Sequence, residues 1–368
     1  MITTPPLHGT LVRALRPASR CAMLCALLLA AASPALAAEA TEGTCDPKGL
    51  LLPLRDEDPA VNKLLASYNL PPTPFRWRLV LQQHTPHYRV YHLTFPSPVK
   101  TPVPENNTVH AEYYLPAKMI GKQPAALVLH ILDGRFLVAR AVCRYFAGSG
   151  TPALMVMMPF YGPRRPTDRS LGGYYLAAPK RVFESMHATV LECRLATCWL
   201  QQRPEVDPQR VGLVGVSLGA ITGGLLAGVD PRFARNVLVL GGGDPARILW
   251  HAHETHSVRE RLEQLGYTLD KIREATVAID PIRFAKRIDP KAMLFINARY
   301  DQTVPRDCTE RLWKAMGKPA IEWLPAGHYS TSLYIPVILP QAHHFVRHGA
   351  RPQAQNAQNA LDKDAAEQ

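Results

Sequence analysis

The fold of this chain is decided by residues 209–225, which read QRVGLVGVSLGAITGGL. An apolar run at 211–216 ends in Gly215-Val216-Ser217-Leu218-Gly219, and small residues that can start a helix follow it. A serine at the tip of a tight strand-to-helix turn has strained backbone dihedrals, so the positions two before and two after it favour glycine. This arrangement is a nucleophile elbow. It predicts a nucleophilic Ser217 if a base and an acid follow.

Length and composition limit the classes of protein to consider. The chain has 368 residues, of which 47% are hydrophobic, so it can fill one large core or two small ones. The formal net charge is +12, but Lys and Arg are scattered and no nucleic-acid-binding module is present. We therefore expect no nucleic-acid partner.

The N-terminal segment has the pattern of an export signal. Arg13, Arg16 and Arg20 precede the apolar stretch 21–32, and Ala35-Leu36-Ala37 supplies small residues at a cleavage site. We predict a signal peptide at 1–37, an exported protein that is periplasmic or secreted, and no stable membrane span after cleavage. An uncleaved N-terminal anchor is the alternative, although the apolar stretch is short for a span.

Five cysteines follow the predicted signal: Cys45, Cys143, Cys193, Cys198 and Cys308. An oxidising compartment would allow one or two disulfides among them, with one thiol left over. A role as small buried apolar residues is the expectation for each, and none is expected to be catalytic.

Hydrophobic patterning predicts an α/β fold with a mostly parallel sheet. Residues 38–75 are predicted as a wrapping N-terminal arm, and three alternating runs then favour antiparallel strands. Afterwards, nearly continuous apolar runs alternate with helical patterns, which is typical of parallel strands covered on both faces. These segments are the alternating runs 76–82, 88–95 and 109–115, and the apolar runs 125–132, 153–158, 211–216, 237–240, 293–296 and 321–324. The main domain is predicted at 76–348, with a cap-like helical insertion at about 244–278 and a disordered tail at 349–368.

Two later residues have the types and positions that Ser217 needs as partners. Asp301 follows the apolar run at 293–296, and His328 follows the last apolar run in the loop LPAGH. Serine becomes a good nucleophile only when an imidazole takes its proton, and the imidazole needs a carboxylate to orient it. The carboxyl ends of parallel strands meet at one sheet edge, so we predict that Ser217, His328 and Asp301 form a catalytic set.

The negative oxygen that forms on attack needs backbone N–H donors. The Leu218 amide is one candidate because it follows the nucleophile at a helix N-terminus. The second is expected in the loop after the 125–130 strand, where we predict the Leu132 amide.

From about residue 75 to 348, the chain resembles the α/β-hydrolase superfamily. It looks most similar to the branch of dienelactone hydrolases, acetyl xylan esterases and prolyl oligopeptidases, through GVSLG, DPIRFAKRIDPKAMLFINARYDQTVP and LPAGH. The resemblance implies an α/β-hydrolase fold, the set Ser217, Asp301 and His328, and carboxylic-ester hydrolysis. One position departs from the family, which usually has glycine after the histidine of the third strand, whereas Ile131 follows His130 here.

Other residues near the predicted site have less certain roles. Tyr161, Arg164 and Arg165 follow the strand at 153–158 in a segment similar to a motif of some family members, and all three are candidate substrate-binding residues. The two arginines are candidates to bind a substrate carboxylate, with salt bridges to surface acids as the alternative. In the segment HAHETH at 251–256, His251 and His253 would diverge around a helix, which leaves at most His253 with His256, or His251 with Glu254, on one face. No further ligand of suitable type is nearby, so no metal site is predicted there. No phosphate-binding loop or dinucleotide fingerprint is present, and no cofactor is expected.

The sequence therefore predicts an exported serine hydrolase that acts on a small-molecule ester through an acyl-enzyme intermediate. Two alternatives stay open. One is a peptidase or amidase of the same fold, and the other is a catalytically silent binding protein with this fold. Oligomeric state and the natural substrate are not predicted.

Overall fold

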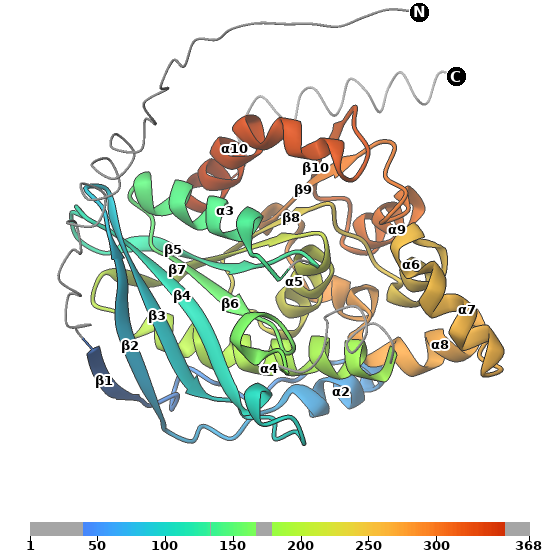
Figure 1. The fold of residues 1–368 in the computed structure, drawn as a ribbon, viewed down its shortest axis with the longest axis horizontal. Coiled ribbons are helices and arrows are strands. Elements are labelled where there is room, and N and C mark those ends of the chain that lie inside the picture. The colour runs from blue at the N-terminus through green and yellow to red at the C-terminus, as the bar shows by residue number, and fades with distance from the viewer. Residues whose placement is uncertain (1–39, 133, 167–178, 350–368) are drawn as a thin grey trace, which may run out of the picture. The chain divides into compact units, whose positions relative to one another are not determined.

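The computed structural model describes residues 40–132, 134–166 and 179–349. The predicted signal peptide and residues 350–368 of the predicted tail lie outside these ranges. The core of the described chain is a ten-stranded sheet with the order β1-β2-β3-β4-β6-β5-β7-β8-β9-β10 (Figure 1). Across the described residues, no helix combines the length and the apolar character that a membrane crossing requires.

The first four strands are antiparallel, as the alternating runs predict. They are β1 (Ala40–Cys45), β2 (Phe75–His84), β3 (Tyr88–Pro96) and β4 (Thr108–Pro116). The first of them lies within the segment predicted as an arm, which also contains helix α2 (Pro59–Leu65). Strand β1 is a mostly exposed edge strand, so its sequence, ATEGTC, lacks the apolar alternation that would have identified it.

The remaining strands are parallel to one another, and most of their residues are buried. They are β5 (Gln123–Leu129), β6 (Ala153–Met157), β7 (Val206–Val216), β8 (Arg235–Val239), β9 (Met293–Ala298) and β10 (Ala320–Leu324). Strand β6 joins the two halves because it pairs antiparallel with β4 and parallel with β5. The predicted mixed sheet is confirmed.

Helices cover both faces of the parallel half. Helices α3 (Leu137–Gly148) and α10 (Ile335–His348) contact one face, and α4 (Pro179–Gln201) and α5 (Leu218–Val229) contact the other (Figure 1). Helix α9 (Arg306–Ala315) lies on the same side as α5. If Gly224 of α5 carried a Cβ atom, that atom would lie 3.5 Å from the side chain of Leu312 in α9. The continuous apolar runs of β5 and β6 follow from this double cover.

An insertion of short helices separates β8 from β9. It contains α6 (Pro245–His251), α7 (His256–Gln264) and α8 (Leu269–Thr276). A small hydrophobic cluster of its own holds these helices together, formed by Ala246, Leu249, Val258, Leu262 and Ile272.

All five cysteines of the described residues are buried free thiols, so the disulfides that the composition would allow are absent from this part of the chain. Burial raises the pKa of the Cys45 thiol and of the Cys308 thiol to about 12 in each case. A thiol that stays protonated at neutral pH is a poor nucleophile. The cysteines therefore act as core residues, as the sequence predicts.

Candidate active site

Ser217 occupies the turn between β7 and α5 with a strained backbone. Its φ is 53° and its ψ is −117°, a conformation that L-residues rarely adopt. The flanking glycines are required by close contacts, because a Cβ at Gly215 would lie 2.2 Å from the carbonyl oxygen of Gly219. A Cβ at Gly219 would lie 2.3 Å from the carbonyl oxygen of Leu129 in β5. The two glycines thus let the turn close on itself and lie against the neighbouring strand.

The structure brings the three predicted side chains into one hydrogen-bonded series. The Ser217 Oγ lies 2.9 Å from the His328 Nε2, and the His328 Nδ1 lies 2.8 Å from the Asp301 Oδ2. The side chain of His328 is 10% exposed and that of Asp301 is 2% exposed, so little water competes for these bonds. A base placed between a hydroxyl and a carboxylate in this way can accept the serine proton.

The carboxylate of Asp301 is held by the backbone that follows it. Its Oδ1 accepts hydrogen bonds from the Thr303 amide at 2.9 Å and the Val304 amide at 2.8 Å, which leaves Oδ2 for His328. The loops that carry the aspartate and the histidine are also joined, because the Tyr300 amide donates to the Ala326 carbonyl at 3.0 Å. These contacts orient His328 without any help from a ligand.

The Leu218 amide, predicted as an oxyanion donor, lies at the start of α5. Leu218 is the first residue of α5, where backbone N–H groups have no partner within the helix. Among the described residues, no backbone carbonyl or side chain accepts a hydrogen bond from this amide. The helix dipole adds a partial positive charge at the same place.

The loop after β5 is organised by His130, which is fully buried. The Met158 amide donates to the His130 Nε2 at 3.0 Å, so the ring proton is on Nδ1, which donates to the Ile131 carbonyl at 2.7 Å. A trans peptide points its C=O and N–H in opposite directions, so the Leu132 N–H is turned away from His130. The same loop is next to the elbow, because Gly219 lies against the Leu129 and His130 carbonyls.

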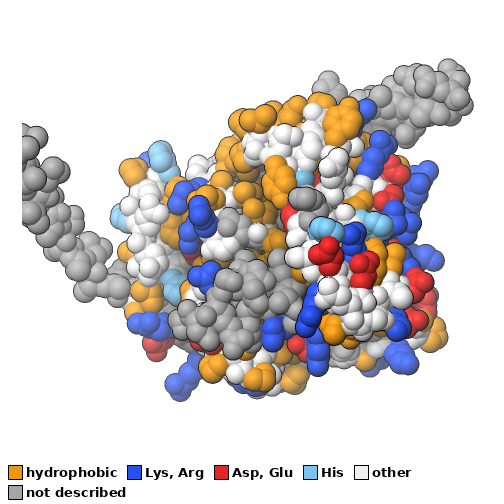
Figure 2. All heavy atoms as spheres, turned by 45° about the vertical axis from the view of Figure 1, so that its right-hand side comes forward, with side chains coloured by type: hydrophobic (Ala, Val, Ile, Leu, Met, Phe, Trp, Pro, Cys, Tyr) orange, Lys and Arg blue, Asp and Glu red, His pale blue; other side chains and the backbone are white. Residues whose placement is uncertain are grey.

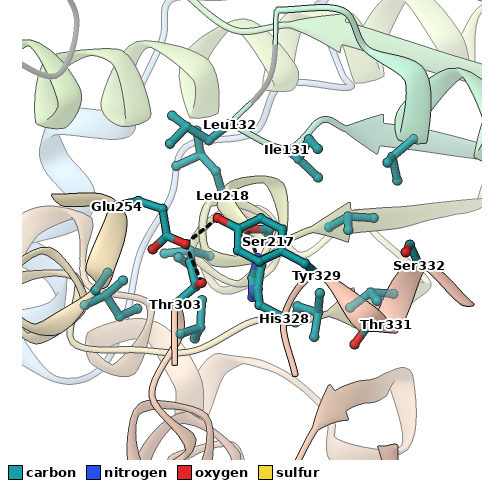
Figure 3. A pocket seen from close by; sticks show the side chains of 18 of the residues that line it. Ile131, Leu132, Ser217, Leu218, Glu254, Thr303, His328, Tyr329, Thr331 and Ser332 are labelled. Carbon is teal, nitrogen blue, oxygen red and sulfur yellow. Dashed lines mark hydrogen bonds between the residues drawn. The ribbon is translucent and has the colours of Figure 1, made fainter. Parts of the chain in front are cut away.

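A cavity of about 390 Å³ opens at Ser217 and His328, near the lower end of the usual size range for ligand pockets. Ile131, Leu132 and Leu218 border it, and most of its other walls are aliphatic (Figure 3). On the molecular surface, Figure 2 shows hydrophobic side chains within a hollow near the middle of this face and charged side chains to the right of it.

One carboxylate of the cavity wall, that of Glu254, was not among the predicted site residues. Glu254, from the insertion, accepts hydrogen bonds through its Oε1 from the Thr303 hydroxyl at 2.8 Å and from the Tyr329 hydroxyl (Figure 3). Burial acts to raise the pKa of Glu254, but these hydrogen bonds, a backbone hydrogen bond and the neighbouring His328 together outweigh it and hold the pKa below its ordinary value. The contact joins the insertion to the residue after His328.

Arg164 is buried in an ion pair and does not border the cavity, which corrects the expectation that it faces a substrate carboxylate. Its side chain is fully buried, and its two terminal nitrogens donate to the Glu192 carboxylate at 2.6 and 2.7 Å. They also donate to the Met157 and Asn106 carbonyls at 2.8 Å each. The arginine therefore fixes the chain after β6 to α4, and a buried acid rather than a surface acid is its partner.

Tyr161 and Arg165 are also outside the cavity wall. Tyr161 is fully buried, and its ring lies 4.5 Å from the ring of His130, centroid to centroid. Arg165 is exposed and does not border the cavity. The expectation that this segment contacts substrate is therefore wrong for Tyr161, whose place is behind the β5 loop.

Three features of the site were not predicted from the sequence. Glu254 was considered only as a possible metal-ligand partner of His251, and Tyr329 carries no signal beyond its position after His328. The role of His130 had a partial signal, since a histidine that directly follows a buried strand lies at the sheet edge where the site forms. In the part of the chain that the structure describes, no group of His, Cys, Asp and Glu side chains is arranged to hold a metal ion.

Comparison with known sequences finds relatives of parts of the chain. No known family model matches the chain. An uncharacterized protein of Mycobacterium tuberculosis is 25% identical over 183 residues, which are 49% of this chain and 42% of that protein. The chain thus matches less than half of that relative. The uncharacterized protein YdjC of Bacillus subtilis is 26% identical over 80 residues, 22% of this chain and 69% of YdjC.

Solved structures are similar over much more of the chain. An acetyl xylan esterase from Paenibacillus sp. R4 aligns with a TM-score of 0.60 and 17% identity, over 83% of this chain and 99% of that one. Acetyl xylan esterase 1 from Thermoanaerobacterium aligns with a TM-score of 0.57 and 18% identity, over 78% and 95% of the two chains. Together with the strand order, these likenesses show that this chain has the α/β-hydrolase fold. The predicted resemblance is confirmed at the level of the fold.

Proposed function

We propose that this chain is a serine hydrolase that cleaves small carboxylic esters through an acyl-enzyme intermediate. The observation that carries the proposal is the continuous series Ser217 Oγ, His328 Nε2, His328 Nδ1 and Asp301 Oδ2, with separations of 2.9 and 2.8 Å. The names of the structurally similar esterases support it at the level of the fold.

In the proposed reaction, Ser217 attacks the ester carbonyl while His328 takes its proton and Asp301 stabilises the charged imidazole. The Leu218 and Leu132 amides hold the negative oxygen of the tetrahedral intermediate. His328 then gives the proton to the leaving alcohol, which produces the acyl-enzyme. Water activated by the same histidine attacks the acyl carbon and releases the acid, so Ser217 regains its proton.

Ester hydrolysis is favoured over the peptidase alternative by the cavity wall. A peptide backbone requires hydrogen-bond partners along its length, and the wall beside Ser217 is mostly aliphatic. The catalytically silent alternative is disfavoured because the three side chains are aligned before any ligand arrives.

Labelling with a fluorophosphonate probe and turnover of p-nitrophenyl acetate test this function. We expect the full chain to be labelled and active, and Ser217→Ala to lose both properties. Ser67→Ala is the control, because Ser67 is an exposed serine in another part of the fold. Labelling that persists in Ser217→Ala, or a folded native protein that turns over amides but no ester, would refute the proposal.

We also propose that the protein is exported, on the basis of the basic and apolar segments of residues 1–37. Expression of the full chain in a Gram-negative host, followed by fractionation and N-terminal sequencing, tests this. A new N-terminus directly after Ala37 in the periplasmic or secreted fraction is expected, and an intact N-terminus in the cytoplasm would contradict it.

A further inference from the structure

The cavity beside Ser217 has two parts that lie on different faces of the sheet. One part is bordered by α4, α5 and the insertion, through residues such as Met186, Ile221 and Ala252. The other part extends between the sheet and the two helices of the opposite face, α3 and α10. We refer to the second part as the α3/α10 lobe. Its wall includes Val138, Ala141, Val142, Ile338, Leu339 and Ala342.

The strands supply the floor of the α3/α10 lobe. A Cβ at Gly212 would lie 2.8 Å from Val346 of α10, so Gly212 faces that helix. Side chains alternate along a strand, which places Val214 and Val216 on the same face. Both valines border the cavity, as does Val239 of the neighbouring strand β8. The lobe therefore reaches into the layer between the sheet and the helices, directly behind the residue that precedes Ser217.

Helices α3 and α10 and strands β7 and β8 contribute only apolar side chains to the lobe. The polar residues of the cavity wall nearest to them are Ser217, His328, Thr331 and Ser332, and the Thr331 hydroxyl already donates to the Gly327 carbonyl at 2.8 Å. A hydroxyl or amide buried in such a space without a partner is strongly unfavourable, so a sugar ring or a peptide does not fit its chemistry. A hydrocarbon chain gains free energy from the same burial. An acetyl group is too short to use this space.

We propose that the α3/α10 lobe binds an aliphatic chain of the ester substrate, so that the protein prefers medium-chain aliphatic esters to acetate esters. The proposal rests on the proposed function, because the lobe matters only if an ester carbonyl reacts at Ser217. Each buried methylene is expected to raise kcat/KM by up to about fourfold, which corresponds to about 0.8 kcal/mol. The rise should stop when the lobe is full.

Two substrate series test the proposal on the full chain. The first is p-nitrophenyl esters of linear acids with two to twelve carbons, and the second is linear alkyl acetates followed by acid release. A rise of kcat/KM with length in the first series places the acyl chain in the lobe, and a rise in the second series places the alcohol there. A flat profile in both series, with acetate esters still cleaved, would overturn the inference and leave the proposed function intact. Absence of turnover and of fluorophosphonate labelling would instead refute the proposed function.

Variants on the two sides of the cavity assign the effect to the lobe. Ala141→Phe fills space in the α3/α10 lobe. The chain-length ratio, which is kcat/KM for the best long-chain ester divided by kcat/KM for the acetate ester, should then fall by at least about tenfold. This fall corresponds to the loss of roughly two buried methylenes. Ala252→Phe adds the same volume on the insertion side and should leave this ratio within about twofold, even where all rates fall together. Equal losses of the ratio in both variants would overturn the assignment.

Leu339→Ala guards against a folding defect in Ala141→Phe. Leu339 is half-buried in the same wall, and its truncation enlarges the lobe. The optimum of the chain-length profile should move to longer chains, with folding checked by circular dichroism. An optimum that stays in place in folded Leu339→Ala would count against the proposal.

Discussion

Replacement of His130 by alanine tests whether a buried side chain prepares the oxyanion-binding loop. His130 holds the Ile131 carbonyl at 2.7 Å while the Met158 amide fixes its ring at 3.0 Å. Without the imidazole, the Ile131–Leu132 peptide loses the contact that turns the Leu132 N–H away from the ring. The Leu218 amide is set by the start of α5 and should stay in place.

The expected loss of kcat follows because His130→Ala should disturb the Leu132 amide and leave the Leu218 amide in place. Removal of one of two oxyanion donors lowers kcat by about 10²- to 10³-fold, equivalent to about 2.7–4 kcal/mol of transition-state stabilisation. We expect His130→Ala to reduce kcat for p-nitrophenyl acetate by about 10²-fold with a small change in KM. The hydrogen bonds to the Ile131 carbonyl and from the Met158 amide are also lost, so the free energy of unfolding should fall by about 2 kcal/mol.

His343→Ala is the matched control for this loss of stability. Like His130, which contacts the rings of Phe136 and Tyr161, His343 contacts two aromatic rings, those of Tyr145 and Phe146. Its Nε2 lies 2.9 Å from the Thr151 hydroxyl, but it does not border the cavity. Urea denaturation and steady-state kinetics on both variants separate the two effects. If both variants lose similar stability and His130→Ala keeps the kcat of His343→Ala, the proposed role of the histidine is wrong.

Three further perturbations probe the scaffold of the site. Arg164→Met leaves Glu192 buried without its ion-pair partner and should lower the free energy of unfolding by about 3–5 kcal/mol in urea denaturation. The double variant Arg164→Met with Glu192→Leu should recover much of this loss. Equal instability of the single and double variants would contradict the prediction. Gly219→Ala places a methyl group 2.3 Å from a β5 carbonyl oxygen, so we expect a lower melting temperature and loss of ester turnover, and a normal melting temperature would refute the close contact. Burial, with a contribution from neighbouring His92, lowers the pKa of His110 to about 4. In the unfolded chain the pKa of this histidine is about 6.5. Between about pH 6.5 and pH 4 the unfolded chain therefore binds a proton at His110 and the folded chain does not, so the free energy of unfolding should fall as the pH drops through this range. His110→Gln should flatten that decline in melting temperature between pH 7 and pH 5, and an unchanged decline would show that other groups cause it.

The positions of Ser217, His328 and Asp301 could be predicted because each of them depends on the end of one strand. Ser217, Asp301 and His328 each follow an apolar run, and a parallel sheet gathers such positions at one edge whatever the loops between them contain. The elbow glycines add a steric requirement that leaves a visible spacing in the sequence. Residue type and strand ends were therefore sufficient for these three side chains.

Other features depend on distances that no spacing encodes. Whether Arg164 faces the cavity or the core is decided by Glu192, a residue of a helix that is remote in the sequence. The loop after β5 departs from the family pattern at Ile131. The direction of the Leu132 N–H in this loop depends on the hydrogen bonds of His130 with the Ile131 carbonyl and the Met158 amide, which no sequence spacing shows. Strand β1 gains its place by pairing with β2, not by apolar alternation of its own.

The steric basis of the glycine pattern also limits what the pattern can reveal about ancestry and activity. Gly215 and Gly219 are required by backbone atoms of the turn and of β5, and neither requirement involves the serine hydroxyl. A descendant of this chain that replaced Ser217 and lost all chemistry would still be under pressure to keep both glycines in order to fold. The spacing of the two glycines therefore reflects the fold and not the chemistry. Selection for turnover would instead preserve the 2.9 and 2.8 Å contacts of the His328 imidazole, and these contacts would be lost first if that selection were relaxed.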